Sequence, residues 1–157
     1  MIGANHLAGA RSNVSALDEY ATPVYCTEAL MRREKFDGEI WECACGSGIM
    51  LKVLEKYNPC VSSDILSYTD FLLEDYITDN IVTNPPYNLA LQFAEQGLRA
   101  SRKKVALFLR LNFLEGQKRY SFFKGSPLKT VYVFSKRQTY ISKGNSQRPT
   151  RGSKASY

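Results

Sequence analysis

The sequence predicts one α/β domain whose mostly parallel sheet is covered by helices on both faces. Short apolar segments typical of strands alternate with segments of helical periodicity along residues 18–140, and this alternation favours a parallel sheet. One expected strand runs into a glycine turn and another into a proline pair, and an expected helix follows each. The chain has 157 residues, 44% of them hydrophobic, which is enough for one domain and too few for two ordinary ones.

The elements are expected in alternating order along the chain. Helices are expected within residues 19–36, 48–57, 88–102 and 112–126. Strands are expected within residues 39–48, 60–65, 80–87, 103–111 and 129–136. Residues 68–76 are expected to form a loop with a helical turn. The segment 103–111 is expected to be a strand buried on both faces, because residues 105–109 within it are all apolar.

The two ends of the chain differ from the domain between them. Residues 1–17 lack the basic and apolar stretches of a signal peptide, so we expect a flexible arm and a cytoplasmic protein. Residues 141–157 are rich in Ser, Gly, Lys and Arg, so we expect a basic, disordered tail. The catalytic or binding domain is therefore assigned to residues 18–140. No apolar run reaches the length that spans a membrane.

The cysteine and histidine content argues against a metal site. The four cysteines have no CxxC spacing, and His6 is the only histidine. Reduced thiols that pack as small apolar groups are the better interpretation. A single histidine near the terminus also disfavours nucleophilic triads that use a histidine base.

Charge is distributed unevenly along the chain. Residues 1–101 contain 7 Lys+Arg and 14 Asp+Glu, whereas residues 102–135 contain 8 and 1, and residues 136–157 contain 6 and none. The second half is thus basic, which suits a polyanionic partner such as nucleic acid. The alternative is that the last stretch is only a solvated tail.

The segment "ECACGSG" (42–48) has the position of a nucleotide-binding turn, between a strand and a helix. Gly46 and Gly48 allow a tight turn and a close approach of backbone to ligand. Asp64, 18 residues after Gly46 at the end of the next strand, is placed to accept hydrogen bonds from ribose hydroxyls. Leu51 stands where a dinucleotide fingerprint has its third glycine, which disfavours NAD or FAD relative to S-adenosylmethionine. Glu42 either contacts the amino-acid end of that cofactor or bonds nearby backbone amides.

The segment "NPPY" (84–87) ends the third expected strand and concentrates hydrogen-bond acceptors. The prolines offer no N–H and restrict the backbone. The side-chain oxygen of Asn84 and the Pro85 carbonyl can together accept both hydrogens of a planar NH2 group, which leaves its nitrogen facing an electrophilic methyl. Tyr87 can stack on the ring that bears the amine. The alternative is a loop whose prolines only stop the strand.

These two motifs resemble those of S-adenosylmethionine-dependent amino-methyltransferases. The similarity is closest to the small adenine-specific (N6) DNA methyltransferases of phages and prophages, and it covers approximately residues 18–140. Besides "ECACGSG" and "NPPY", it rests on "YATP" (20–23), Asp64, "DF" (70–71), "LFLRLNFLEGQKRY" (107–120) and "VYVFSKR" (131–137). Cys43 stands where proline is usual in the family.

The resemblance implies a Rossmann-like, doubly wound class I methyltransferase domain that methylates the N6 amine of an extruded adenine in DNA. The catalytic residues are then Asn84, Pro85, Pro86 and Tyr87. The contacts to S-adenosyl-L-methionine come from Tyr20, Thr22, Pro23, Glu42, Ala44, Cys45, Gly46, Gly48, Asp64, Asp70, Phe71 and Asn84. On this hypothesis Lys118 and Arg119 contact phosphates, although a solvated helix face explains them equally well. The sequence predicts no metal or membrane partner and carries no signal for an oligomeric state.

Three alternatives to this assignment stay open. The tetrapeptide is shared with methyltransferases of RNA bases and of protein glutamines, and only the basic second half favours nucleic acid. The family's sheet ordinarily ends with an apolar antiparallel strand, and residues 141–157 contain no such segment, so the domain is expected to lack it. The chain is then either truncated or replaced there by a basic sequence, and a non-catalytic nucleic-acid-binding module is the second hypothesis. A dinucleotide oxidoreductase is the third.

Overall fold

The computed structural model describes residues 21–138, and these contain a four-stranded sheet in which all strands are parallel. The strands are β1 (Ile40–Glu42), β2 (Cys60–Ser62), β3 (Thr78–Thr83) and β4 (Ser101–Leu107), in the spatial order β2-β1-β3-β4. The helices are α2 (Val24–Arg33), α3 (Ile49–Leu54), α4 (Ala90–Ala100) and α5 (Gln117–Gly125). Short 3-10 turns are η1 (Ile65–Ser67), η2 (Phe71–Leu73), η3 (Tyr87–Leu89) and η4 (Leu111–Leu114).

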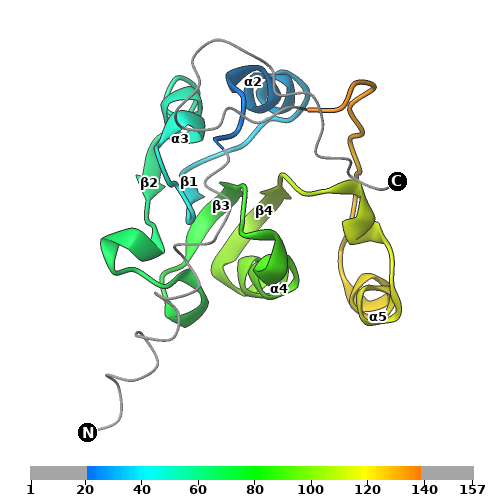
Figure 1. The fold of residues 1–157 in the computed structure, drawn as a ribbon. Helices are drawn as coiled ribbons and strands as arrows, with labels where there is room; N and C mark the ends of the chain where they lie inside the picture. Colours follow the sequence, from blue (N-terminus) through cyan, green and yellow to red (C-terminus); the bar gives the residue numbers. More distant parts are fainter. Residues whose placement is uncertain (1–20, 139–157) are drawn as a thin grey trace, which may run out of the picture.

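The sheet is covered on both faces, with α2 and α3 on one side and α4 on the other (Figure 1). Neighbouring strand residues point to opposite faces. Ile40 packs with Met50 and Leu54 of α3, whereas Trp41 packs with Phe93 of α4. The α/β class with a parallel sheet, expected from the alternating pattern, is confirmed, and the arrangement is consistent with a Rossmann-like topology.

An aromatic cluster fills the core on the α4 side. The Phe71 ring lies 5.0 Å from that of Trp41 and 4.9 Å from that of Phe93, between ring centroids. The indole N–H of Trp41 donates to the Ser63 hydroxyl at 2.9 Å, so its one polar atom is paired. The expected helical turn within residues 68–76 is confirmed as η2, and it carries Phe71 into this cluster.

The strand order places a topological switch point between β1 and β3. The chain leaves β1 through α3 toward β2, and it leaves β3 through α4 toward the opposite edge at β4. The loops after β1 and β3 therefore diverge to opposite faces of the sheet. In open α/β sheets this divergence opens a crevice at the carboxyl ends of the strands, where ligands bind.

The prediction of a strand within residues 129–136 is wrong, because no strand forms there and β4 is the edge of the sheet that residues 21–138 build. The segment has strand-like residues, but a strand also needs a neighbouring edge to pair with. Its contacts are made by side chains instead: the Phe134 ring lies 6.0 Å from the Phe108 ring, and the Tyr132 hydroxyl donates to Glu34 at 2.7 Å. Val133 is 64% exposed.

The position of β4 overturns a second expectation. A strand buried on both faces was expected over residues 103–111, but β4 spans 101–107 and is only partly buried, because within the described part of the chain it pairs with β3 alone. The helix expected within residues 112–126 is also divided. Gly116, with φ of +95°, separates η4 from α5. The proposed arm, the proposed tail and Tyr20 lie outside the described residues.

Candidate functional site

The carboxyl ends of the four parallel strands bring the expected site residues to one edge of the sheet. Asp64 follows β2, the glycine turn follows β1, Asn84 follows β3, and Arg110 follows β4. Because β1 and β3 are neighbours, the glycine turn and the NPPY segment follow adjacent strand ends at the switch point. The order of the strands, which was not predicted from the sequence, therefore places the glycine turn next to the NPPY segment.

The glycine turn after β1 depends on backbone conformations that favour glycine. Gly46 has φ of +48° and Gly48 has φ of +72°. The Gly48 N–H donates to the Cys45 carbonyl at 2.7 Å, which closes the turn. A Cβ at either glycine would meet no described atom within 4 Å, so open space borders the turn on that side. This leaves room for a ligand close to the backbone.

Asp64 links the turn after β1 to the loop after β2. One carboxylate oxygen accepts the Gly46 N–H at 2.8 Å, and the other accepts the Leu66 N–H at 2.9 Å. The expected ribose acceptor therefore also holds the glycine turn in place. Each carboxylate oxygen has a further lone pair, so these bonds leave Asp64 able to accept from a ligand hydroxyl.

Glu42 is a buried carboxyl group at the base of the same turn, with 2% of its surface exposed. Burial raises its pKa to about 8, and the nearby Asp64 charge adds to this, while a hydrogen bond from the Leu51 backbone N–H opposes it. Its Oε2 atom has no hydrogen-bond partner among the described residues. The hydrogen bond between Glu42 and a backbone N–H, which one of the two interpretations expected, is therefore present. The Oε2 atom remains for a donor group of a ligand. A buried oxygen of this kind fits a cationic or N–H-bearing group.

The NPPY segment presents two acceptors of the expected kind. The Asn84 amide nitrogen donates to the Thr22 hydroxyl at 2.9 Å. Among residues 21–138 neither the Asn84 Oδ1 atom nor the Pro85 carbonyl accepts a hydrogen bond, whereas the Pro86 carbonyl accepts the Leu89 N–H at 2.9 Å. The amide NH2 is thus held by Thr22, and Oδ1 is left to accept.

The remaining expected cofactor residues occupy different positions. Pro23 precedes α2 as its N-cap residue, next to Thr22. Ala44 and Cys45 form part of the turn itself, and the Cys45 N–H donates to the Ser63 carbonyl at 3.1 Å. Asp70 accepts the Leu72 N–H at 3.0 Å and so caps η2. Phe71 is 2% exposed, and its ring is engaged in the core cluster.

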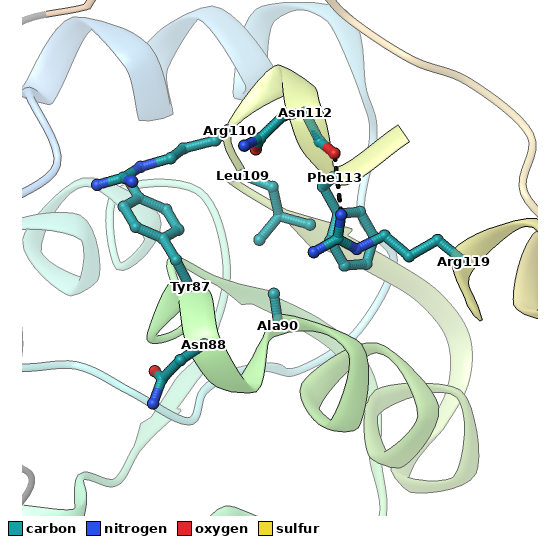
Figure 2. A pocket seen from close by; sticks show the side chains of 8 residues that line it. All are labelled: Tyr87, Asn88, Ala90, Leu109, Arg110, Asn112, Phe113 and Arg119. Atoms are coloured by element: carbon teal, nitrogen blue, oxygen red, sulfur yellow. Dashed lines mark hydrogen bonds between the residues drawn. The ribbon is translucent and has the colours of Figure 1, made fainter. Parts of the chain in front are cut away.

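A cavity of about 190 Å³ borders Tyr87 on the β4 side of this edge (Figure 2). It is lined by Tyr87, Asn88, Ala90, Leu109, Arg110, Asn112, Phe113 and Arg119. Arg119 reaches it, whereas Lys118 is exposed on α5 and does not line it. The Arg110 guanidinium lies over the Tyr87 ring, 4.2 Å from its centroid.

Sequence reasoning missed Thr22 as a partner of Asn84, and it missed Arg110 entirely. Arg110 follows the strand next to β3, so its place at the same edge of a parallel sheet was the available signal. Thr22 lies 62 residues from Asn84, and no local pattern links them.

Within residues 21–138, His, Cys, Asp and Glu side chains form no group of three or more that could hold a metal ion. In the same range, no helix has both the length and the apolar character needed to cross a membrane. Comparison with protein-family models finds no match for the chain, and comparison with curated proteins finds none either.

Proposed function

We propose that the chain is an S-adenosylmethionine-dependent methyltransferase that acts on the N6 amine of adenine in DNA, in a Rossmann-like class I domain. The observation that carries the proposal is the pair of acceptors at the end of β3, the Asn84 Oδ1 atom and the Pro85 carbonyl, beside the glycine turn of β1. The resemblance of both motifs to amino-methyltransferases supports the same conclusion.

The glycine turn and its two acids suit the cofactor. Asp64 offers lone pairs to the ribose hydroxyls. Glu42 is neutral in the free protein below about pH 8, and the positively charged amino-acid end favours its ionised form, whose Oε2 atom then accepts from that end. The open side of Gly46 and Gly48 leaves space for both parts of the cofactor. When bound, S-adenosylmethionine supplies a methyl group on a positively charged sulfur. Leu51 in place of a third glycine makes a dinucleotide the poorer ligand.

The NPPY segment holds the attacking amine. The two acceptors bind both hydrogens of a planar NH2 group, so its nitrogen is turned toward the methyl donor. Thr22 keeps the Asn84 amide in the orientation that presents oxygen, because its hydroxyl accepts one of the two amide N–H groups. Positioning of this kind lowers the barrier by fixing the approach of the two reactants.

Nucleic acid is favoured over protein by charge and by the aromatic ring at the site. The basic residues of the second half attract a polyanion. Tyr87 offers a stacking surface worth roughly 1 to 3 kcal/mol per base, which offsets part of the few kcal/mol that base extrusion costs.

Methyl transfer from labelled cofactor tests the substrate class. The full chain is incubated with radiolabelled S-adenosylmethionine and, separately, with adenine-containing DNA, RNA of the same sequence, and protein. Label is expected in DNA. Label only in RNA or only in protein would overturn the assignment of DNA as the substrate, but it would still support methylation of an amine or amide nitrogen.

A second function, nucleic-acid binding without catalysis, is favoured by one observation. Among the described residues, no strand pairs with the outer edge of β4. Calorimetry with S-adenosylmethionine separates the two functions, since a binding module that has lost its catalytic role is expected to bind DNA but not the cofactor.

Replacement of Asp64 is expected to weaken cofactor binding. Asp64→Ala removes the ribose acceptor and the bond that holds the Gly46 N–H, so we expect the affinity for S-adenosylmethionine to fall at least about tenfold. Calorimetry measures the affinity, and Asp75→Ala, an exposed acid in the loop before β3, is the matched control. Equal affinities in Asp64→Ala and the unmodified protein would remove Asp64 from the cofactor site.

A further inference from the structure

The cavity beside Tyr87 is bounded by two pairs that each join an arginine to an aromatic ring. Figure 2 shows the Arg110 side chain over Tyr87 on one side and Arg119 beside Phe113 on the other, with Leu109 and Ala90 between them. The guanidinium carbons lie 4.2 Å from the Tyr87 centroid and 5.1 Å from the Phe113 centroid. The walls are thus cationic and aromatic, and the floor is apolar.

The charge of the cavity points to an anionic ligand. Of the eight residues within 21–138 that line it, two are arginines and none is acidic. The Arg119 guanidinium is fixed, because it donates to the Asn112 carbonyl at 3.0 Å and to the Glu115 carbonyl at 3.1 Å. One positive charge is therefore built into the wall, and planar guanidinium groups are well suited to phosphate oxygens.

The size of the cavity limits what it can take. About 190 Å³ is below the range of roughly 300 to 1,000 Å³ typical of pockets for whole small-molecule ligands. A single ring or a phosphate group with part of its sugar is of the right order, whereas a dinucleotide is too large. The apolar floor of Leu109 and Ala90 suits the sugar or the ring edge.

Arg110 covers one face of the Tyr87 ring, with its guanidinium carbon 4.2 Å from the ring centroid. A planar guanidinium stacked on an aromatic ring occupies much the same space as a stacked base. A base and Arg110 therefore cannot both lie on this face of Tyr87. When a base enters, the guanidinium must turn away, and the nearest groups of a nucleic acid for it to bind are the phosphates next to that base.

We infer that this cavity is a nucleotide subsite, in which the substrate ring replaces Arg110 on Tyr87 and Arg110 binds the adjoining phosphate. The inference rests on the proposed function, because that function places the target ring at Tyr87. It also narrows the substrate class. A glutamine side chain of a protein has neither a ring nor a phosphate to exchange with Arg110, so the subsite selects a nucleic-acid strand, DNA or RNA.

Binding of single-stranded oligonucleotides to the full chain tests the subsite without requiring catalysis. The probes are fluorescently labelled DNA and RNA of one sequence, about 12 nucleotides long, and fluorescence anisotropy is measured between about 50 and 200 mM salt. Arg110→Gln is expected to lower the affinity about tenfold and to reduce the slope of log affinity against log salt by about 0.7. Arg110→Lys keeps the charge and is expected to keep the slope. Lys124→Gln, a charge-matched change on α5 outside the cavity, is expected to have a smaller effect.

A DNA probe with an abasic site in place of its adenine tests the exchange of ring for guanidinium. The unmodified chain is expected to bind the adenine probe severalfold more tightly, and Tyr87→Leu is expected to abolish this difference. Equal affinities and slopes for Arg110→Gln and Lys124→Gln would overturn the subsite.

The outcomes separate the subsite from the proposed function. Oligonucleotide binding that depends on Arg110, without methyl transfer, supports the subsite and contradicts the function. DNA methylation with oligonucleotide affinity insensitive to Arg110→Gln supports the function and contradicts the subsite. Methylation of protein without oligonucleotide binding contradicts both. Stronger binding to one of the two probes identifies DNA or RNA as the source of the nucleotide.

Discussion

Replacing Asn84 by alanine is expected to lower the rate of methyl transfer by roughly 10²- to 10³-fold, the size of effect seen when one positioned hydrogen-bonding group is removed from an active site. The reason is geometric. Without Oδ1 the Pro85 carbonyl is the one acceptor left for the amine. A single acceptor does not fix the direction of the amine nitrogen. The affinity for S-adenosylmethionine is expected to stay nearly unchanged, because Asp64, Glu42 and the glycine turn are intact.

Single-turnover transfer of labelled methyl groups measures the Asn84→Ala rate, and calorimetry measures cofactor affinity. Gln92→Ala is the matched control, since it removes an amide of similar chemistry from the exposed face of α4. Full activity in Asn84→Ala would contradict the role of this side chain. A loss that appears equally in Gln92→Ala would show that α4 itself, and not the amine-binding oxygen, had been disturbed.

Glu42 is expected to make the stability of the protein fall as the pH rises from about 4.5 to about 8. Its pKa in the folded protein is about 8 because the carboxyl is buried, against the ordinary value of 4.5 in the unfolded chain. Between these values the folded state holds a proton that the unfolded state has released, so raising the pH favours unfolding. The free energy of unfolding is expected to decrease by up to about 5 kcal/mol across this window.

Chemical denaturation near pH 5 and near pH 8 measures this effect. Glu42→Gln cannot ionise, so its stability is expected to depend less on pH and to exceed that of the unmodified protein at the higher value. Glu55→Gln, an exposed carboxyl just after α3, is the control and is expected to change the pH dependence little. The same pH dependence in Glu42→Gln and in the unmodified protein would show that Glu42 is not buried as a neutral acid.

Apolar periodicity predicted the helices and strands that pack against the core or pair with another strand. The segments that became β1 to β3 and α2 to α4 were recognisable because apolar periodicity records which side faces a core. The same reasoning failed for residues 129–136, where Val131 and Val133 have strand propensity but no edge pairs with their backbone. Pairing is a property of two segments, so one segment's composition does not determine it.

The candidate site was predictable in outline for a similar reason. Gly46, Asp64 and Asn84 each follow an expected strand, and carboxyl ends of parallel strands share one edge. Their individual partners were not predictable. The bond from Gly46 to Asp64 and the bond from Asn84 to Thr22 join residues that are 18 and 62 positions apart.

The amino-acid sequence was sufficient to predict the α/β class, the glycine turn and the acceptor-rich NPPY segment, because these depend on periodicity, on positive φ angles and on missing N–H groups within a few residues. Three features follow from the folded chain instead: the strand order that places the turn next to NPPY, the burial that raises the pKa of Glu42, and the position of Arg110 over the Tyr87 ring. The physical reason is that each of these is a contact or a desolvation between segments distant along the chain, and only the folded chain brings them together.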